Sequence, residues 1–101
     1  MATRVEITDR ALRDPAIIYE RIEAEATARA ARWFDGLEKA INGLEKRPHR
    51  APATPEDRTL RHLLYGTKTR VYRIIYAIEE VASTVYVLHI RAPGRATLPR
   101  R

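Results

Sequence analysis

The sequence predicts an α+β fold in which a twisted antiparallel sheet packs against an N-terminal helical hairpin, in the order β-α-α-β-β-β. Three observations lead to this class. Two runs rich in Val, Ile and Tyr, at 70–78 and 84–91, flank a short polar interval. Two helical stretches follow each other with almost no linker, and residues 3–8 alternate apolar with polar side chains. The helices are therefore expected to cover one side of the sheet.

The fold is organised around residues 70–91, which are expected to form a β-hairpin. Period-two alternation gathers the large apolar side chains on one face: Tyr72, Ile74, Tyr76, Ile78, Tyr86, Leu88 and Ile90. The opposite face then carries Val71, Arg73, Ile75, Ala77, Val85, Val87, His89 and Arg91. If Ile78 lies opposite Tyr86, Arg73 lies opposite Arg91. Like charges facing each other across a ladder repel, which favours an anion site over the alternative of two solvated arginines.

The amino-terminal half begins with a strand at 3–8, whose Val5 and Ile7 share a buried face. Thr8 and Asp9 can then cap a helix. Asp14-Pro15 indicates a second helix start, with 9–13 as a separate turn; a single kinked helix is the alternative. The apolar stripe expected to face the core consists of Leu12, Ile18, Tyr19, Ile22 and Ala26.

A second helix is expected from 28 to 46, capped by Thr27. Its core stripe recurs at spacings of four and three, at Trp33, Leu37, Ile41 and Leu44. Residues 47–59 contain three prolines and read as a loop, followed by a strand at 60–65 and a turn at 66–69. One domain at 1–95 and a basic tail at 96–101 complete the predicted organisation.

Charge is unevenly distributed along the 101 residues. Residues 1–45 carry seven basic and nine acidic side chains, a charge of −2, whereas residues 46–101 carry twelve and four, a charge of +8. This segregation indicates a polyanionic partner, either nucleic acid or an acidic protein segment. With no long apolar run and no secretory signal pattern, we expect a soluble cytoplasmic protein with no membrane contact.

Several kinds of chemistry are excluded by the residue types. The chain has no cysteine, and its one serine, Ser83, falls in the hairpin turn. His49, His62 and His89 lack metal-ligand spacing, so we expect no metal and no other cofactor. What remains is a basic sheet face whose arginines could hold a phosphodiester while a histidine moves protons, or could grip an acidic peptide instead.

In this interpretation Arg73, Arg91 and His89 are the candidate catalytic residues. The candidate phosphate or RNA contacts are Arg61, His62, Lys68, Arg70 and Arg95.

The residues also resemble a known family. The resemblance rests on several segments: the helix with Ala30, Trp33, Phe34, Leu37, Ala40, Ile41 and Leu44, the proline-rich loop, Leu63-Leu64-Tyr65-Gly66, YRIIYAI at 72–78 and VYVLHIR at 85–91. Together these segments are similar to the RelE/ParE superfamily of bacterial toxins. The similarity covers 3–95 in the expected order. It implies a toxin of a type II toxin–antitoxin, or plasmid stabilisation, module that a cognate antitoxin neutralises.

Family members differ in their target. RelE-like toxins are mRNA interferases that cut messages in the ribosome without a metal, whereas ParE-like toxins inhibit DNA gyrase. In the ribonuclease branch, the resemblance assigns phosphate contacts to Arg73 and to Arg91 or Arg95. Ala92-Pro93 stands where many relatives have a histidine, and no matching tyrosine follows. Both activities, and a basic interaction module that has lost toxicity, therefore stay open, with ribonuclease slightly favoured by the arginine and histidine cluster.

Overall fold

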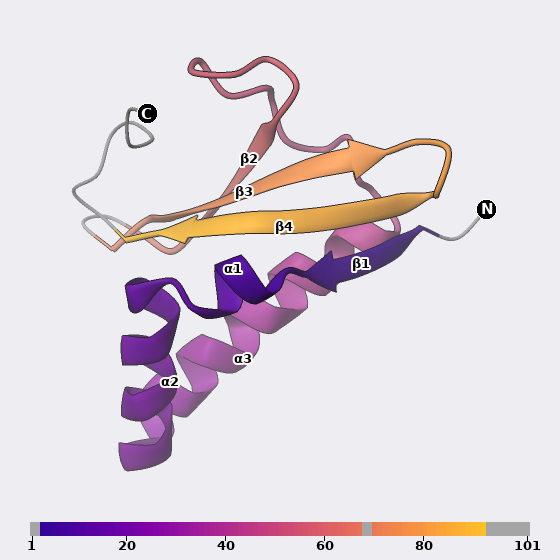
Figure 1. Ribbon diagram of the computed structural model, residues 1–101. Coiled ribbons are helices and arrows are strands. Elements are labelled where there is room, and N and C mark those ends of the chain that lie inside the picture. The colour runs from indigo at the N-terminus through magenta and orange to yellow at the C-terminus, as the bar shows by residue number, and fades with distance from the viewer. Residues whose placement is uncertain (1–2, 68–69, 93–101) are drawn as a thin grey trace.

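The structure, a computed structural model, describes residues 3–67 and 70–92 (Figure 1). Its elements are β1 (Arg4–Ile7), α1 (Asp9–Leu12), α2 (Pro15–Ala26), α3 (Ala28–Asn42), the 3₁₀ turn η1 (Gly43–Glu45), β2 (Arg61–Tyr65), β3 (Tyr72–Glu79) and β4 (Thr84–Arg91). The predicted order of strands and helices is confirmed. No helix in the described part of the chain is long and apolar enough to cross a membrane.

The four strands form one mixed sheet in the order β1-β4-β3-β2. β2, β3 and β4 are antiparallel neighbours as predicted, but β1 pairs with β4 in parallel. The departure from a fully antiparallel sheet has a simple cause. β1 and β4 are joined through the helices and the other two strands, and a connection of that length does not impose the antiparallel direction that a hairpin turn imposes.

The hairpin register is correct at one end and wrong at the other. Arg73 lies opposite Arg91 as predicted, but Ile78 lies opposite Val85 instead of Tyr86. The register shifts by one residue between Ile75 and Tyr76, which leaves Leu88 of β4 as the extra residue of a β-bulge.

Because of the bulge, part of β4 places its side chains on the opposite face from the one predicted. Val85 and Val87 are fully buried on the helix-covered face, where Tyr86 and Leu88 were expected. A strict period-two pattern cannot reveal an inserted residue, so the prediction was wrong for the half of β4 nearest the turn.

A separate short helix, α1, precedes the helical hairpin, and a new helix starts at Pro15, as the Asp14-Pro15 pair predicted. The side chain of Thr8 accepts a hydrogen bond from Ala11 N–H at the start of α1, and α2 begins afresh at Pro15. Thr27 caps α3 by accepting from Ala30 N–H at 3.0 Å. These caps satisfy backbone donors that the first helical turn leaves unpaired.

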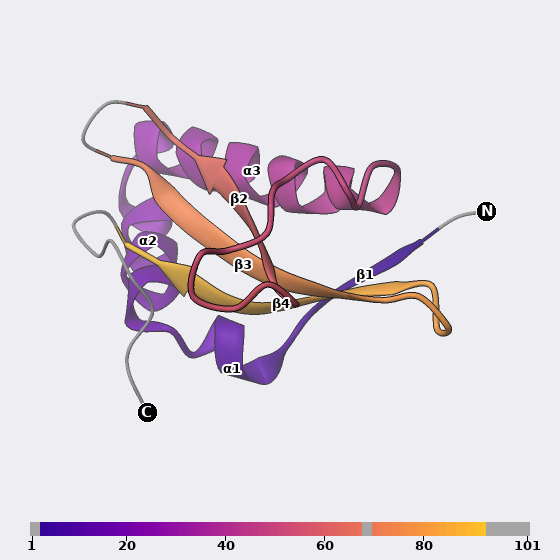
Figure 2. The same cartoon turned by 90° about the horizontal axis from the view of Figure 1, so that it is seen from above.

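The core lies between α3 and the sheet. Leu37, Ile41 and Leu44 are buried and Trp33 packs against them, which confirms the predicted stripe. Figure 1 shows α2 and α3 on one side of the sheet, and Figure 2 shows, from above, β2, β3 and β4 crossing over them.

The predicted core face of α2 is wrong. Leu12, Ile18, Tyr19 and Ile22 are 38%, 47%, 60% and 60% exposed. The buried positions along α1 and α2 are instead Ala11, Asp14, Ile17 and Glu20, spaced three apart. Two carboxylates therefore occupy the inward face that hydrophobicity assigned to isoleucine and tyrosine.

Candidate functional site

The candidate site lies on the sheet face away from the helices. Arg73 of β3 has two neighbours in register, Arg91 of β4 and Leu64 of β2, and the next pairs along the same face bring in His89 and His62 opposite Ile75. Residues directly opposite each other in antiparallel strands share a face. The sheet face therefore gathers two arginines and two histidines: Arg73, His89 and Arg91 share a face of the hairpin as the sequence predicted, and His62 joins them from β2.

Arg73 is held by a carboxylate that the sequence analysis did not identify. Its Nη2 donates to Glu56 Oε1 at 3.1 Å, its Nη1 donates to Glu56 Oε2 at 3.3 Å, and its Nε donates to His62 Nδ1 at 3.3 Å. The Arg73 side chain is only 10% exposed. This two-pronged ion pair orients the guanidinium and offsets its charge. We call Glu56, His62, Arg73, His89 and Arg91 the sheet-face cluster.

Glu56 reaches the cluster because its loop is folded back on β2. Thr54 N–H donates to Leu60 O at 2.8 Å, and His62 N–H donates to Pro52 O at 3.1 Å. Thr54 Oγ1 also closes the tip of the loop on the backbone of Asp57. These long-range contacts fix the loop, and no periodicity in the sequence could reveal them; the one available signal was an acid inside a basic half of the chain.

Arg91 is less completely paired than Arg73. Its Nη2 lies 3.5 Å from His89 Nδ1, and its Nη1 lies 3.9 Å from Asp14 Oδ1, at the limit of an ion pair. Its Nε is buried and has no hydrogen-bond partner among the described residues. Such a buried donor carries a desolvation penalty that an incoming anion would remove.

Both histidines of the cluster favour the neutral form. Burial lowers the pKa of His62 below its usual value, and the charge of Arg73 lowers it further, against an opposing effect of Glu56. Burial likewise lowers the pKa of His89, helped by Arg10 and Arg91 and opposed by Asp14. At pH 7 each imidazole is therefore neutral and a poor proton donor, and on His62 the one acceptor nitrogen, Nδ1, is already bonded to Arg73 Nε.

The other predicted phosphate contacts do not join the cluster. Arg61 lies opposite Tyr76, on the helix-covered face, and its guanidinium donates to Ala51 O. Arg70 donates to Glu20 Oε2 at 3.1 Å and lies 5.7 Å from the centre of the Trp33 ring. Lys68 and Arg95 fall outside the described residues, as does the predicted tail at 96–101.

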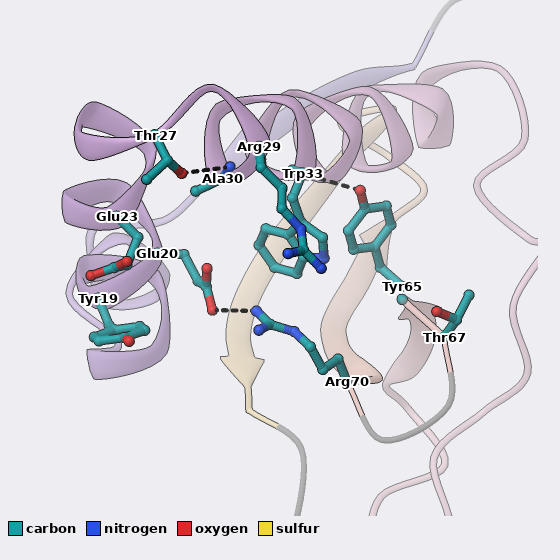
Figure 3. Close-up of a pocket in the computed structure, with 11 residues that line it drawn as sticks. Tyr19, Glu20, Glu23, Thr27, Arg29, Ala30, Trp33, Tyr65, Thr67 and Arg70 are labelled. Atoms are coloured by element: carbon teal, nitrogen blue, oxygen red, sulfur yellow. Dashed lines mark hydrogen bonds and ion pairs between the residues drawn. The ribbon is translucent and has the colours of Figure 1, made fainter.

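Arg70 borders a pocket of about 610 Å³ between the helical hairpin and the β2–β3 turn (Figure 3). Trp33 and Tyr65 form one wall in an edge-to-face contact at 5.2 Å, and Glu20 lies at the α2 side. The pocket is on the opposite face of the sheet from the cluster. Among the residues that the structure describes, no group of His, Cys, Asp and Glu could hold a metal ion.

The structure thus defines a small α+β domain with a four-stranded mixed sheet and two facing arginines on the sheet face away from the helices. Residues 5–96 match the sequence model of the family described as ParE toxin of type II toxin–antitoxin system, parDE, so the chain belongs to this family. A solved structure, the toxin–antitoxin complex RelBE2 from Mycobacterium tuberculosis, is similar at 23% identity and a TM-score of 0.59. That match covers 91% of this chain and 99% of the other, and it shows the fold alone. No curated protein matches.

Proposed function

We propose that this chain, the toxin of a type II toxin–antitoxin module, arrests growth by metal-free cleavage of mRNA on the ribosome. One observation carries the proposal: Arg73 lies directly opposite Arg91, whose buried Nε has no partner among the described residues. A phosphodiester bound on this face of the sheet, over the two strands, would contact both guanidinium groups and offer an acceptor to Arg91 Nε.

The cluster supplies the parts of a phosphodiester cleavage. A neutral histidine, His89 beside Arg91, takes the proton of the ribose 2′-hydroxyl, whose oxygen then bonds to phosphorus. The bond from phosphorus to the 5′-oxygen breaks, and Arg73 and Arg91 stabilise the extra negative charge of the transition state. The leaving oxygen takes its proton from solvent, and His89 returns the proton it accepted to solvent, so the step uses no second protein acid. We therefore expect a slow ribonuclease that depends on the ribosome to position its substrate.

Inhibition of DNA gyrase is the second candidate, and two observations favour it. Glu56 already pairs with both terminal nitrogens of Arg73, which leaves this arginine less available to a phosphate. A toxin that only binds its target has no need of a free phosphate site, and the family model that matches is named for ParE.

The antitoxin partner is expected on the helical hairpin and the sheet edge. Ile18, Tyr19 and Ile22 of α2 are exposed and offer it an apolar surface. Acidic residues of the antitoxin would meet the +8 half of the chain, which would speed association at low salt. The two candidate targets, the ribosome and DNA gyrase, act in the cytoplasm, and we therefore place this protein there.

Growth and biochemistry separate the candidates. Induced expression of the chain alone is expected to arrest bacterial growth, and coexpression of its antitoxin is expected to restore it. Purified toxin should then cut mRNA on programmed ribosomes and leave gyrase supercoiling unaffected. Inhibited supercoiling with uncut messages would identify the gyrase branch, and normal growth at confirmed soluble expression would favour a module without toxicity.

A further inference from the structure

At the start of helix α2 and within it, two carboxylates take the buried positions that the sequence pattern assigned to larger apolar side chains. Asp14, the residue before α2, is 8% exposed and Glu20 is 4% exposed, whereas Ile18 and Ile22 of the same helix face solvent. A buried carboxylate is unfavourable unless hydrogen bonds and opposite charges compensate it. Turning the helix this way sacrifices apolar burial, so the two acids must make contacts that outweigh the loss.

Asp14 holds the end of β4 instead of capping its own helix. An aspartate at this position usually accepts a backbone N–H of the first helical turn, but Asp14 makes no such bond. Its Oδ2 accepts from Ile90 N–H at 2.7 Å, in the part of β4 that extends beyond the pairing with β1. Its Oδ1 lies 3.9 Å from Nη1 of Arg91, the next residue.

Glu20 holds the start of β3 in the same way. Its Oε2 accepts from the hydroxyl of Tyr72 and from Nη2 of Arg70, the latter at 3.1 Å (Figure 3). Tyr72 immediately precedes Arg73, and burial together with the bond to Glu20 raises the pKa of Tyr72 to about 12. The tyrosine therefore stays protonated and keeps donating to Glu20.

One helix thus fastens both strand ends that carry the facing arginines. We propose that Asp14 and Glu20 are positioning residues that set the placement of Arg91 and Arg73 relative to each other. This inference rests on the proposed function only where it concerns catalysis; the positioning itself is a property of the folded chain. It also explains why the apolar pattern of α2 points outward, because the helix is oriented by its carboxylates.

Isosteric variants test the proposal. Asp14→Asn and Glu20→Gln remove a charge with little change of shape, and Asp9→Asn and Glu23→Gln are matched controls at positions that hold no strand. In the ribosome assay, each test variant should lower kcat by about 10–100-fold with KM nearly unchanged, the size of effect seen when a supporting partner of a site residue is removed. The controls should behave as wild type.

Two NMR readouts do not require activity. The charge of Asp14 raises the pKa of His89, against burial and against Arg10 and Arg91, so Asp14→Asn should lower that pKa further. The Nε–H resonances should also move, that of Arg91 in Asp14→Asn and that of Arg73 in Glu20→Gln. If wild-type toxin cuts no RNA, the proposed function fails while these readouts still decide the positioning.

Folded test variants with wild-type kcat, His89 pKa and arginine resonances would overturn the inference. Should Glu20→Gln fail to fold, Tyr72→Phe removes only the hydroxyl that Glu20 accepts, and it should shift the Arg73 resonance in the same direction. An unmoved Arg73 resonance in folded Tyr72→Phe would equally refute the role of Glu20.

Discussion

At the scale of single residues, the main finding is the ion pair between Glu56 and Arg73. From the sequence, Arg73 was expected on the sheet face away from the helices, as part of an anion site or solvated, and no acidic partner was predicted for it. In the structure Arg73 is almost buried, and its two terminal nitrogens both bond to Glu56. The candidate catalytic arginine therefore also contributes to stability, since bonds to charged groups typically contribute about 1.5–3 kcal/mol each in buried settings.

Removing the charge of Glu56 tests this double role. Glu56→Gln can accept from only one nitrogen of Arg73 through its amide oxygen, so we expect the free energy of unfolding to fall by about 1–2 kcal/mol. The charge of Glu56 also raises the pKa of His62, so that pKa should fall further in the variant. Urea denaturation and imidazole NMR measure the two effects, with the exposed Glu79→Gln as control. Wild-type values in both measurements would show that the ion pair is not formed in solution.

The lowered pKa values of His62 and His89 predict how stability depends on pH. An unfolded histidine titrates near 6.5, above its folded value, so in that interval the unfolded chain binds more protons than the folded chain. Stability should accordingly be complete above about pH 6.5 and decline as the pH falls through the folded pKa values. Urea midpoints between pH 7.5 and 5.5 measure the decline, and the double variant His62→Gln/His89→Gln should flatten it. An equally steep decline in the double variant would contradict this origin.

At the scale of elements, the sequence predicted the strands and the two long helices, but not that the helix expected at 28–46 ends at Asn42, nor which faces of α2 and β4 point inward. The stripe of α3 was correct because its inward positions are purely apolar, so hydrophobicity alone orients it. The stripe of α2 was wrong because Asp14 and Glu20 are oriented by bonds to distant strands. The predicted faces of β4 were wrong between the turn and the bulge, because one inserted residue inverts the period-two alternation for every position on one side of it.

The bulge itself can be tested by deleting Leu88, which has no partner in β3. With Leu88 removed, Val87 and Ile90 stay on the helix-covered face while His89 and Arg91 stay on the other, so the ladder becomes regular. We expect a folded protein whose stability changes by about 1 kcal/mol, as for an ordinary point substitution. Deletion of Ile74, a fully buried partner of Ile90, should prevent folding. Circular dichroism and urea denaturation distinguish these results; an unfolded Leu88 deletion would show that the bulge is required.

The β2–β3 turn depends on Gly66, whose φ is +116°. A Cβ atom there would lie 1.9 Å from Arg70 O, so Gly66→Ala should reduce stability by at least about 2 kcal/mol. Gly43 has φ −63° and nothing within 4 Å of an added Cβ, so Gly43→Ala should raise stability by about 0.5–1 kcal/mol. Thermal and urea unfolding measure both. Equal effects of the two substitutions would contradict this description of the turn.

At the scale of the whole molecule, the two faces of the sheet carry different groups of side chains. The helix-covered face holds the core, the pocket beside Trp33 and the exposed apolar side of α2, while the opposite face holds the sheet-face cluster. The carboxylates of α2 connect them. This division would let an antitoxin bind on the helices and still influence the arginines, because α2 holds the strand ends that carry them.

Arg73 is proposed to act on a scissile phosphate, and the rate of mRNA cleavage on programmed ribosomes measures that action. Arg73→Ala should lower kcat by roughly 10²–10³, the usual loss for one electrostatic contact to a transition state. The exposed Arg58→Ala, on the loop that carries Glu56, removes the same charge and should cut at the wild-type rate. An Arg73→Ala protein that is folded by circular dichroism and cuts ribosome-bound mRNA as fast as wild type would contradict the account.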